Sequence, residues 1–223
     1  MTTKKPNLQE FVTDWTTDYQ TRANEIPIFQ PQTKLNEAQV QEFARVFFHL
    51  RGHFYKFLWT MGNLEGASFT QKKVVLGNIS EEFGGSGESH DQMYQDFTAS
   101  VGVDTSKELV EEKYYLEFAQ AYNQVHIQEL FGVTLNQAWA IFAAYESLDN
   151  VDYNNYSTML EQTKIDLDLK FFRVHQTAGH YNNCEPELIK IWNKNPQTVH
   201  KGYKFVMQSQ IKMLRQLNDH LLS

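Results

Sequence analysis

Carboxylates and histidines stand at several places in this sequence where metal binding is the chemistry they could support. Glu81 and Glu82 end the segment "NISEE", and His90 follows Glu82 across the glycine-rich stretch "FGGSGES". A carboxylate and an imidazole on either side of a turn can bind one metal ion. Two acids at a helix end can equally be solvated, with Gly84 and Gly85 capping the helix. Taken alone, the stretch favours the solvated helix end.

Glu146 is the next acid of interest. It follows the apolar run "AWAIFAAY", which predicts a helix that is buried on most faces. A buried acid has to be paired or bound to a metal, because an isolated buried charge is costly. Glu146 also lies near the predicted end of that helix, where it could reach solvent.

Two histidines lie in "KFFRVHQTAGHYN". His175 shares an apolar helix face with Phe171 and Phe172, a position that suits a hydrogen-bonded core histidine as well as a ligand. His180 lies five positions further on, about 140° around an ideal helix. Both rings can face one centre only if the helix is distorted between them, which Gly179 permits.

The other histidines and the cysteine carry weaker signals. His49 and His53 have the four-residue spacing that can share a metal, but Leu50 stands where a zinc protease places Glu. Cys184 precedes "EPEL" in a predicted loop, and we expect it to be inert. Three isolated histidines are predicted to have structural or surface roles: His126, His200 and His220.

Composition limits the class of protein. The chain has 223 residues and a formal charge of −7, which argues against binding to nucleic acid or to an anionic membrane surface. No apolar run approaches the roughly 20 residues that span a bilayer, and the first residues lack the apolar region of a secretory signal. A single cysteine cannot form an internal disulfide. These features predict a cytoplasmic protein.

The elements that must position these residues are predicted to be helices. None of the five prolines lies between residues 32 and 185, and proline breaks helices. Alternating β-branched runs are few, and hairpin turn pairs are absent. We expect a single all-α domain over residues 1–223, a bundle of seven to nine helices. Residues 1–32 would form an N-terminal helix and a proline-containing lead-in, and residues 33–223 the core bundle.

Apolar spacing and caps set the predicted helix boundaries. The first helix starts at Asn7 or Thr13, and Asn36 and Ser106 are predicted caps of later helices. The helix over 134–148 is nearly all apolar and should be deeply buried. The later helices are predicted over residues 35–61, 68–82, 89–101, 107–126, 134–148, 149–163, 166–182 and from about 198.

Four features together resemble one family: the pattern "N-x-x-E-E-x-G" over residues 78–84, His90, the apolar helix that ends in Glu146, and "FFRVH" with His175. They resemble the heme-oxygenase-like diiron oxidases and oxygenases. These proteins share the broader fold of thiaminase-II, of the pyrroloquinoline-quinone (PQQ) synthase and of the chlamydial protein associating with death domains. The resemblance covers most of the chain, from about residue 43 onward, and implies a heme-oxygenase-like bundle.

The resemblance also implies a set of metal ligands. Carried over residue by residue, Glu82, His90, Glu146 and His175 match the family's pattern. Glu81 is the alternative to Glu82 if the register differs by one. Two ferrous ions need anionic oxygens to balance their charge and imidazoles to complete the shell, with open positions for dioxygen.

The late part of the pattern departs from the family, which has His-x-x-x-Asp-x-x-His there. Counting from His175, Gly179 stands at the Asp position and Asn182 at the final His position. His180 lies near but displaced, so either it is a rearranged ligand or the second metal position is depleted. A full dimetal site, a single metal and no functional metal are all compatible with this segment.

What the resemblance implies for function is an oxidase or oxygenase that uses non-heme iron, as two irons or iron with manganese. Dioxygen would be the co-substrate, and a small organic substrate would be held in the bundle. No heme is expected, because only His49 or His53 could serve as a proximal ligand on an early helix. The resemblance further implies a homodimer.

Two other classes stay open. One is a metal-free enzyme of the thiaminase-II or quinone-synthase type. The thiaminase-type nucleophilic cysteine should lie on an inward helix face, and Cys184 looks misplaced for that. A non-catalytic interaction protein with a decayed metal site would explain Gly179 and Asn182. Because the chain is negatively charged, we expect neither class to have nucleic acid or a membrane as a partner.

Overall fold

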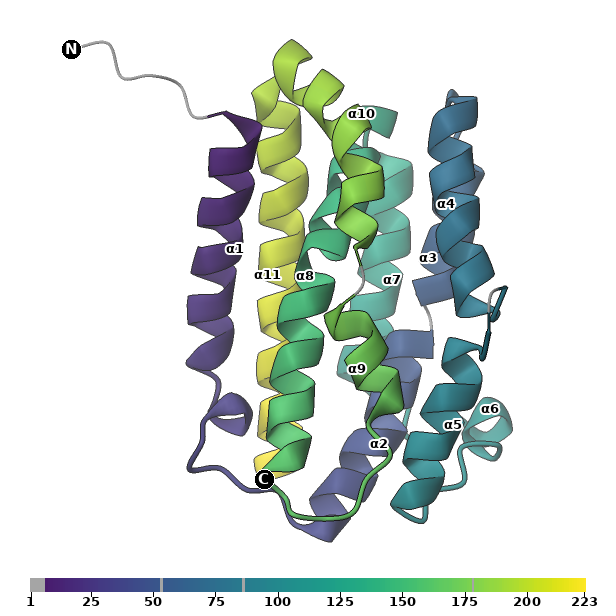
Figure 1. Cartoon of the computed structure of the whole chain (residues 1–223), viewed down its shortest axis with the longest axis vertical. Coiled ribbons are helices and arrows are strands. Elements are labelled where there is room, and N and C mark those ends of the chain that lie inside the picture. The colour runs from purple at the N-terminus through teal and green to yellow at the C-terminus, as the bar shows by residue number, and fades with distance from the viewer. Residues whose placement is uncertain (1–6, 53, 86, 178) are drawn as a thin grey trace, which may run out of the picture.

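A computed structural model describes residues 7–52, 54–85, 87–177 and 179–223 of the chain. These residues form eleven α-helices and a short 3-10 helix (Pro27–Phe29), with no β-strand among them, so the all-α prediction is confirmed (Figure 1). The α-helices are α1 (Leu8–Asn24), α2 (Glu37–Gly52), α3 (Phe54–Gly62), α4 (Phe69–Glu82), α5 (His90–Ser100), α6 (Glu108–Glu111), α7 (Glu117–Gly132), α8 (Leu135–Glu161), α9 (Lys170–Gln176), α10 (His180–Lys194) and α11 (Pro196–Leu222).

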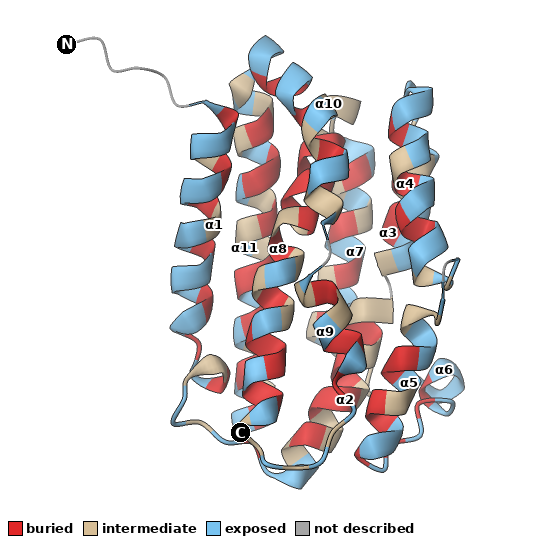
Figure 2. Ribbon diagram, in the orientation of Figure 1, coloured by how far each residue is buried: buried red, intermediate tan, exposed pale blue. Residues whose placement is uncertain are grey.

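The centre of the bundle is the pair α8 and α11, each 27 residues long. α8 packs against α11, α10 and α9, and α1 covers both long helices from one side (Figure 1). The prediction that the apolar helix is deeply buried is confirmed, because every residue from Ala138 to Ala144 is buried. Buried positions face the middle of the bundle, and exposed positions face outward (Figure 2).

Close contact between the long helices depends on one glycine. A Cβ atom at Gly202 of α11 would lie 2.8 Å from the Cβ atom of Ala140 and 2.9 Å from the backbone nitrogen of Ile141. Both distances are shorter than van der Waals contact allows. The absent side chain therefore lets α11 approach the backbone of α8.

The single helix predicted over residues 107–126 is wrong, because the chain forms α6 and α7 instead. Glu112 adopts the left-handed conformation, with φ 46°, and ends α6. Glu108 is buried, and its carboxylate accepts a hydrogen bond of 2.9 Å from the backbone N–H of Tyr114, which turns the chain back. The Ser106 side chain does not cap a helix, because its hydroxyl donates to Asp104.

The predicted boundary between residues 148 and 149 is also wrong, since α8 runs through it without a break. Conversely, the helix predicted over 166–182 is divided, with α9 ending at Gln176 and α10 beginning at His180. Cys184, predicted in a loop, is buried within α10, which also contains Pro186 in its interior. A proline in a helix interior removes one backbone hydrogen bond, and α10 continues through it.

The helix predicted over residues 35–61 is described as α2 and α3, on either side of residue 53. The prediction for His53 as half of a metal-binding pair therefore lies outside the described residues. Two other predicted helices are confirmed with their ends: α4 is capped by Ser68 and α5 by Ser89. In the described part of the chain, no helix is long and apolar enough to cross a membrane.

Candidate metal centre

The end of α4 positions the paired glutamates. The N–H of Gly84 donates to the Glu81 carbonyl at 3.0 Å, and the N–H of Gly85 to the Ser80 carbonyl at 2.8 Å. This is the Schellman arrangement, and Gly84 has the positive φ of 77° that it requires. The glycine cap exists, but it does not leave both acids in solvent. The Glu82 side chain is 24% exposed and that of Glu81 48%.

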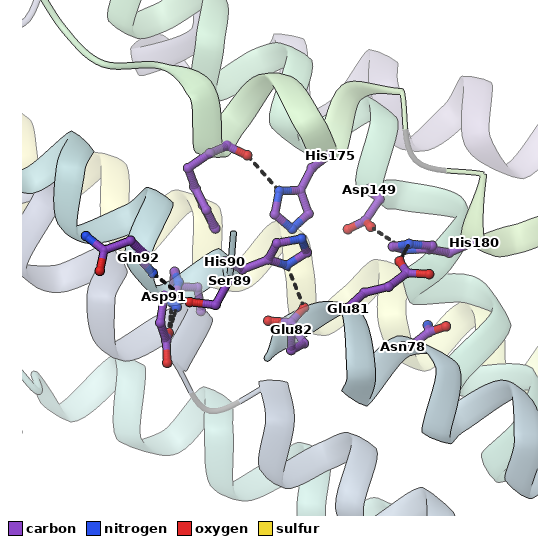
Figure 3. A network of polar contacts seen from close by, with 12 residues as sticks. Asn78, Glu81, Glu82, Ser89, His90, Asp91, Gln92, Asp149, His175 and His180 are labelled. Carbon is purple, nitrogen blue, oxygen red and sulfur yellow. Dashed lines mark hydrogen bonds and ion pairs between the residues drawn. The ribbon is translucent and has the colours of Figure 1, made fainter. Parts of the chain in front are cut away.

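The first group of ligand-type side chains consists of Glu82, His90 and His175. His90 is the first residue of α5, directly after the turn that follows α4. Its Nδ1 atom lies 3.1 Å from a carboxylate oxygen of Glu82, and its ring centre lies 4.5 Å from that of His175 (Figure 3). One ligand atom from each residue lies within 4.8 Å of the other two. We call these three residues the first triad.

The second group consists of Glu146, Asp149 and His180, which we call the second triad. Glu146 and Asp149 are three positions apart and so share one face of α8. His180 opens α10, and its Nδ1 atom lies 3.3 Å from a carboxylate oxygen of Glu146 and 3.5 Å from one of Asp149. One ligand atom from each residue again lies within 4.8 Å of the others.

Asp149 is the one member of the two triads that sequence reasoning missed. The predicted helix boundary placed it at the start of a new helix, where an aspartate reads as a cap. A continuous helix would have put it on the face of Glu146. That three-residue spacing was the signal that could have found it.

Polar contacts behind the triads orient their members. Nδ1 of His175 donates to the Phe171 carbonyl at 2.8 Å. A carbonyl can only accept, so Nδ1 carries the hydrogen and Nε2 is the nitrogen that would bind a metal. Asn78 donates from Nδ2 to a carboxylate oxygen of Glu146 at 2.8 Å. Such partners fix the rotamer and tautomer of a ligand.

Glu81 has the same role toward the second triad. Its Oε2 atom lies 2.6 Å from Nε2 of His180 (Figure 3). The other ring nitrogen of His180 faces Glu146. Glu82 is therefore the residue brought into a triad, and Glu81 supports a triad from outside. Gly179 precedes α10, and Asn182 is exposed within it, so neither belongs to a triad.

Burial and neighbouring charges shift the pKa values of four residues in the two triads. Burial raises the pKa of Glu82, but the hydrogen bond and charge of His90, together with the charges of His175 and Arg51, bring the pKa below its ordinary value. Burial raises the pKa of Glu146, whose side chain is only 1% exposed. The hydrogen bonds to Asp149 and Glu146 raise the pKa of His180. Burial lowers the pKa of His175.

Both triads face one cavity of about 120 Å³. Glu82 and His175 from the first triad line it together with Asp149 and His180 from the second. Aromatic and apolar side chains of α2, α3, α7 and α8 make up much of the remaining wall. A small molecule in this cavity would therefore contact both triads.

The donor set fits iron. The first triad has the two-histidine, one-carboxylate composition that is typical of non-heme iron oxygenases, and neither triad contains a thiolate. Three carboxylates of low exposure lie close together with imidazoles as their partners, an arrangement that a metal cation would neutralise. The residues present are suited to one metal ion per triad.

The other predicted residues lie elsewhere. His49 is buried and pairs with Glu108 at 3.1 Å, in neither triad. His126 is also buried and lines the cavity, so a surface role is wrong for it. Burial raises the pKa of the Cys184 thiol, which disfavours the thiolate that a thiaminase-type nucleophile needs. His200 and His220 are half-buried and belong to neither triad.

Comparisons with known proteins identify the family and the fold of the chain. The profile of the family described as "Iron-containing redox enzyme" matches residues 41–181, more than half of the chain. A solved domain of unknown function from Shewanella denitrificans OS217, described as having a heme oxygenase-like fold, matches with a TM-score of 0.77 and 15% identity. The match covers 98% of this chain and 95% of that domain. No curated protein matches.

The solved domain establishes the fold, and the profile establishes the family. The predicted heme-oxygenase-like resemblance is therefore confirmed. The matched range begins before Glu82 and ends one residue after His180. All six residues of the two triads thus lie inside the part that the family shares. The chain belongs to the family of iron-containing redox enzymes and has a heme-oxygenase-like fold.

Proposed function

We propose that the two triads bind two iron ions, or iron with manganese, and that the protein uses them with dioxygen to oxidise a small organic substrate. The observation that carries this proposal is the convergence of two carboxylate–histidine triads on one cavity. Membership of an iron-containing redox family supports it. The substrate would lie in that cavity, within reach of both triads.

Each triad would hold one metal ion through its own side chains. Glu82, His90 and His175 would hold one, and Glu146, Asp149 and His180 the other. Bound iron supplies the electrons for reducing dioxygen and the open positions for binding it. Three carboxylates would balance most of the charge of two divalent ions, which allows the pair to sit in a largely buried site.

The residues around the triads prepare the site. Tyr153 stacks on His175, with ring centres 4.0 Å apart and planes at 14°, and so restricts its orientation. Phe171 packs edge-on against His90 and against Tyr153, and so places an apolar ring beside the first triad. Glu81 keeps the proton of His180 on Nε2, because its carboxylate can only accept there.

An anaerobic titration with ferrous iron, followed by exposure to oxygen, tests the proposal. We expect about two irons per chain, followed by oxygen uptake. His90→Ala should remove one metal and Asp149→Ala the other, and both should abolish oxygen uptake. His200→Ala changes a histidine outside the triads and should leave both readings intact. Iron binding that neither triad variant changes would refute the assignment.

A further inference from the structure

The cavity continues from the triads to a second polar region, which we call the inner end. Tyr145, Asp149, Asp152 and Tyr156 all line the cavity and follow one another on α8 at intervals of four, three and four residues. That spacing places them along one helix face. With a rise of about 1.5 Å per residue, Asp152 lies about 4.5 Å further along the axis than Asp149. The inner end consists of Tyr145, Asp152 and Tyr156 of α8 together with His126 of α7 and Gln210 of α11.

Three buried polar atoms of the inner end have no hydrogen-bond partner among the described residues. They are Nε2 of His126 and the hydroxyl oxygens of Tyr145 and Tyr156. A buried polar group that makes no hydrogen bond destabilises the folded chain. Three of them around one cavity indicate a ligand that supplies the missing partners.

The tautomer of His126 decides which kind of partner is missing. Its Nδ1 atom lies 2.5 Å from the Tyr122 carbonyl, so Nδ1 carries the hydrogen. Burial lowers the pKa of His126 to about 4, and the ring is therefore neutral near pH 7. Its Nε2 atom is then an acceptor. A ligand has to bring a hydrogen-bond donor to it.

Asp152 makes the inner end acceptor-rich and acidic. One carboxylate oxygen accepts from the Tyr19 hydroxyl at 2.6 Å, and the other accepts from Nε2 of Gln210 at 2.7 Å. Each oxygen can accept once more. No lysine or arginine in the described part of the chain forms an ion pair with Asp152, although it is buried. Burial raises its pKa to about 7, and a nearby cation would favour the carboxylate form.

We propose that the inner end binds an ammonium group, with Asp152 as its counter-ion and Nε2 of His126 as a second acceptor. The aromatic ring of Tyr156, four residues beyond Asp152 on the same face of α8, would lie beside the cation. An anionic group would be repelled by the Asp152 carboxylate. The volume of about 120 Å³ is smaller than the roughly 150 Å³ that admits benzene, so the group has to be compact. The inference rests on the proposed function only in making this amine the substrate.

Calorimetry on the full chain tests the charge preference with three probes of similar size. n-Butylamine is a cation at pH 7, 1-butanol is neutral and butyrate is an anion. We expect n-butylamine to bind at least tenfold more tightly than the other two, with and without ferrous iron under anaerobic conditions. Equal binding of 1-butanol or tighter binding of butyrate by the unaltered chain would overturn the proposal.

Three variants test which residues cause the preference for the amine. Asp152→Asn should abolish the advantage of n-butylamine over 1-butanol. Tyr145→Phe should weaken amine binding by a few fold, because it removes one hydroxyl partner but keeps the ring. Glu108→Gln neutralises a buried acid that does not line the cavity and should preserve the preference. If Asp152→Asn fails to fold, the three-probe comparison and Tyr145→Phe still decide.

Metal content measured on the same samples separates this inference from the proposed function. An amine preference in a chain that binds no iron would support the inner end and contradict the iron proposal. Iron binding without an amine preference would contradict the inner end alone. A preference that persists unchanged in Asp152→Asn would overturn the role of that residue as counter-ion.

Discussion

The carboxylate of Glu81 and the imidazole of His180 meet at 2.6 Å, although the two residues are 99 positions apart in the chain. Glu81 is the last but one residue of α4, near the glycine cap, and His180 begins α10. The contact joins the two halves of the sequence beside the second triad (Figure 3). It determines which nitrogen of His180 faces Glu146, because the other nitrogen is occupied by Glu81.

Glu81 should therefore affect metal affinity without being a ligand. Loss of an outer partner of a ligating histidine typically lowers metal affinity about 10–100-fold. We expect Glu81→Ala to lower the affinity for one of the two irons by that factor. Glu81→Gln keeps a hydrogen-bond acceptor and should lower the affinity less. Competition with a ferrous chelator measures the affinity. Glu88→Ala removes a surface acid that pairs with Lys170 and serves as the control. Wild-type affinity in Glu81→Ala would contradict this role.

His126 should make the stability of the protein depend on pH. Burial lowers its pKa from 6.5 to about 4. Between these values the unfolded chain binds a proton that the folded chain does not, so folding becomes less favourable as the pH falls. The resulting loss at pH 5, relative to pH 7.5, is about 2 kcal/mol.

Urea unfolding of the wild type and of His126→Gln at pH 7.5 and pH 5 measures that contribution. The variant should lose about 2 kcal/mol less free energy of unfolding on acidification than the wild type does. The comparison between the two chains removes the contributions of the other titrating groups, which both chains share. Equal losses in both would show that His126 is not buried as a neutral ring.

Gly202 should be intolerant of a side chain. A methyl group there would press on Ala140 and on the backbone of α8, so we expect Gly202→Ala to lower the free energy of unfolding by about 1–3 kcal/mol. Gly77 lies in α4 with nothing within 4 Å of an added Cβ atom. Gly77→Ala should instead raise stability by up to about 1 kcal/mol. Chemical denaturation of both variants checks the opposite signs, and a neutral Gly202→Ala would mean that the helices are less closely packed.

Much of the architecture could be predicted from the sequence because its signals are local. The apolar periodicity of α11 and the serine caps of α4 and α5 each depend on a few neighbouring residues. Boundaries that depend on distant partners were predicted wrongly. The break after α6 depends on the buried side chain of Glu108, and α8, which continues through residue 149, packs along its length against α11, α10 and α9.

The candidate metal centre could likewise be predicted only in part. Glu82, His90, Glu146 and His175 could be singled out by resemblance, and the structure brings them into the two triads, although their role as ligands stays a prediction. Asp149 was hidden by the misplaced helix boundary. His180 could be placed only once the chain was seen to break between α9 and α10. The predicted homodimer and cytoplasmic location also stay predictions.

The most direct measurement of the central claim is anomalous diffraction at the iron absorption edge, from crystals of the protein grown with ferrous iron without oxygen. We predict two anomalous peaks per chain, one bound by Glu82, His90 and His175 and the other by Glu146, Asp149 and His180. Crystals of Glu108→Gln, whose altered acid lies outside both triads, should show the same two peaks. No peak at either triad, or iron bound only elsewhere on the chain, would contradict the account.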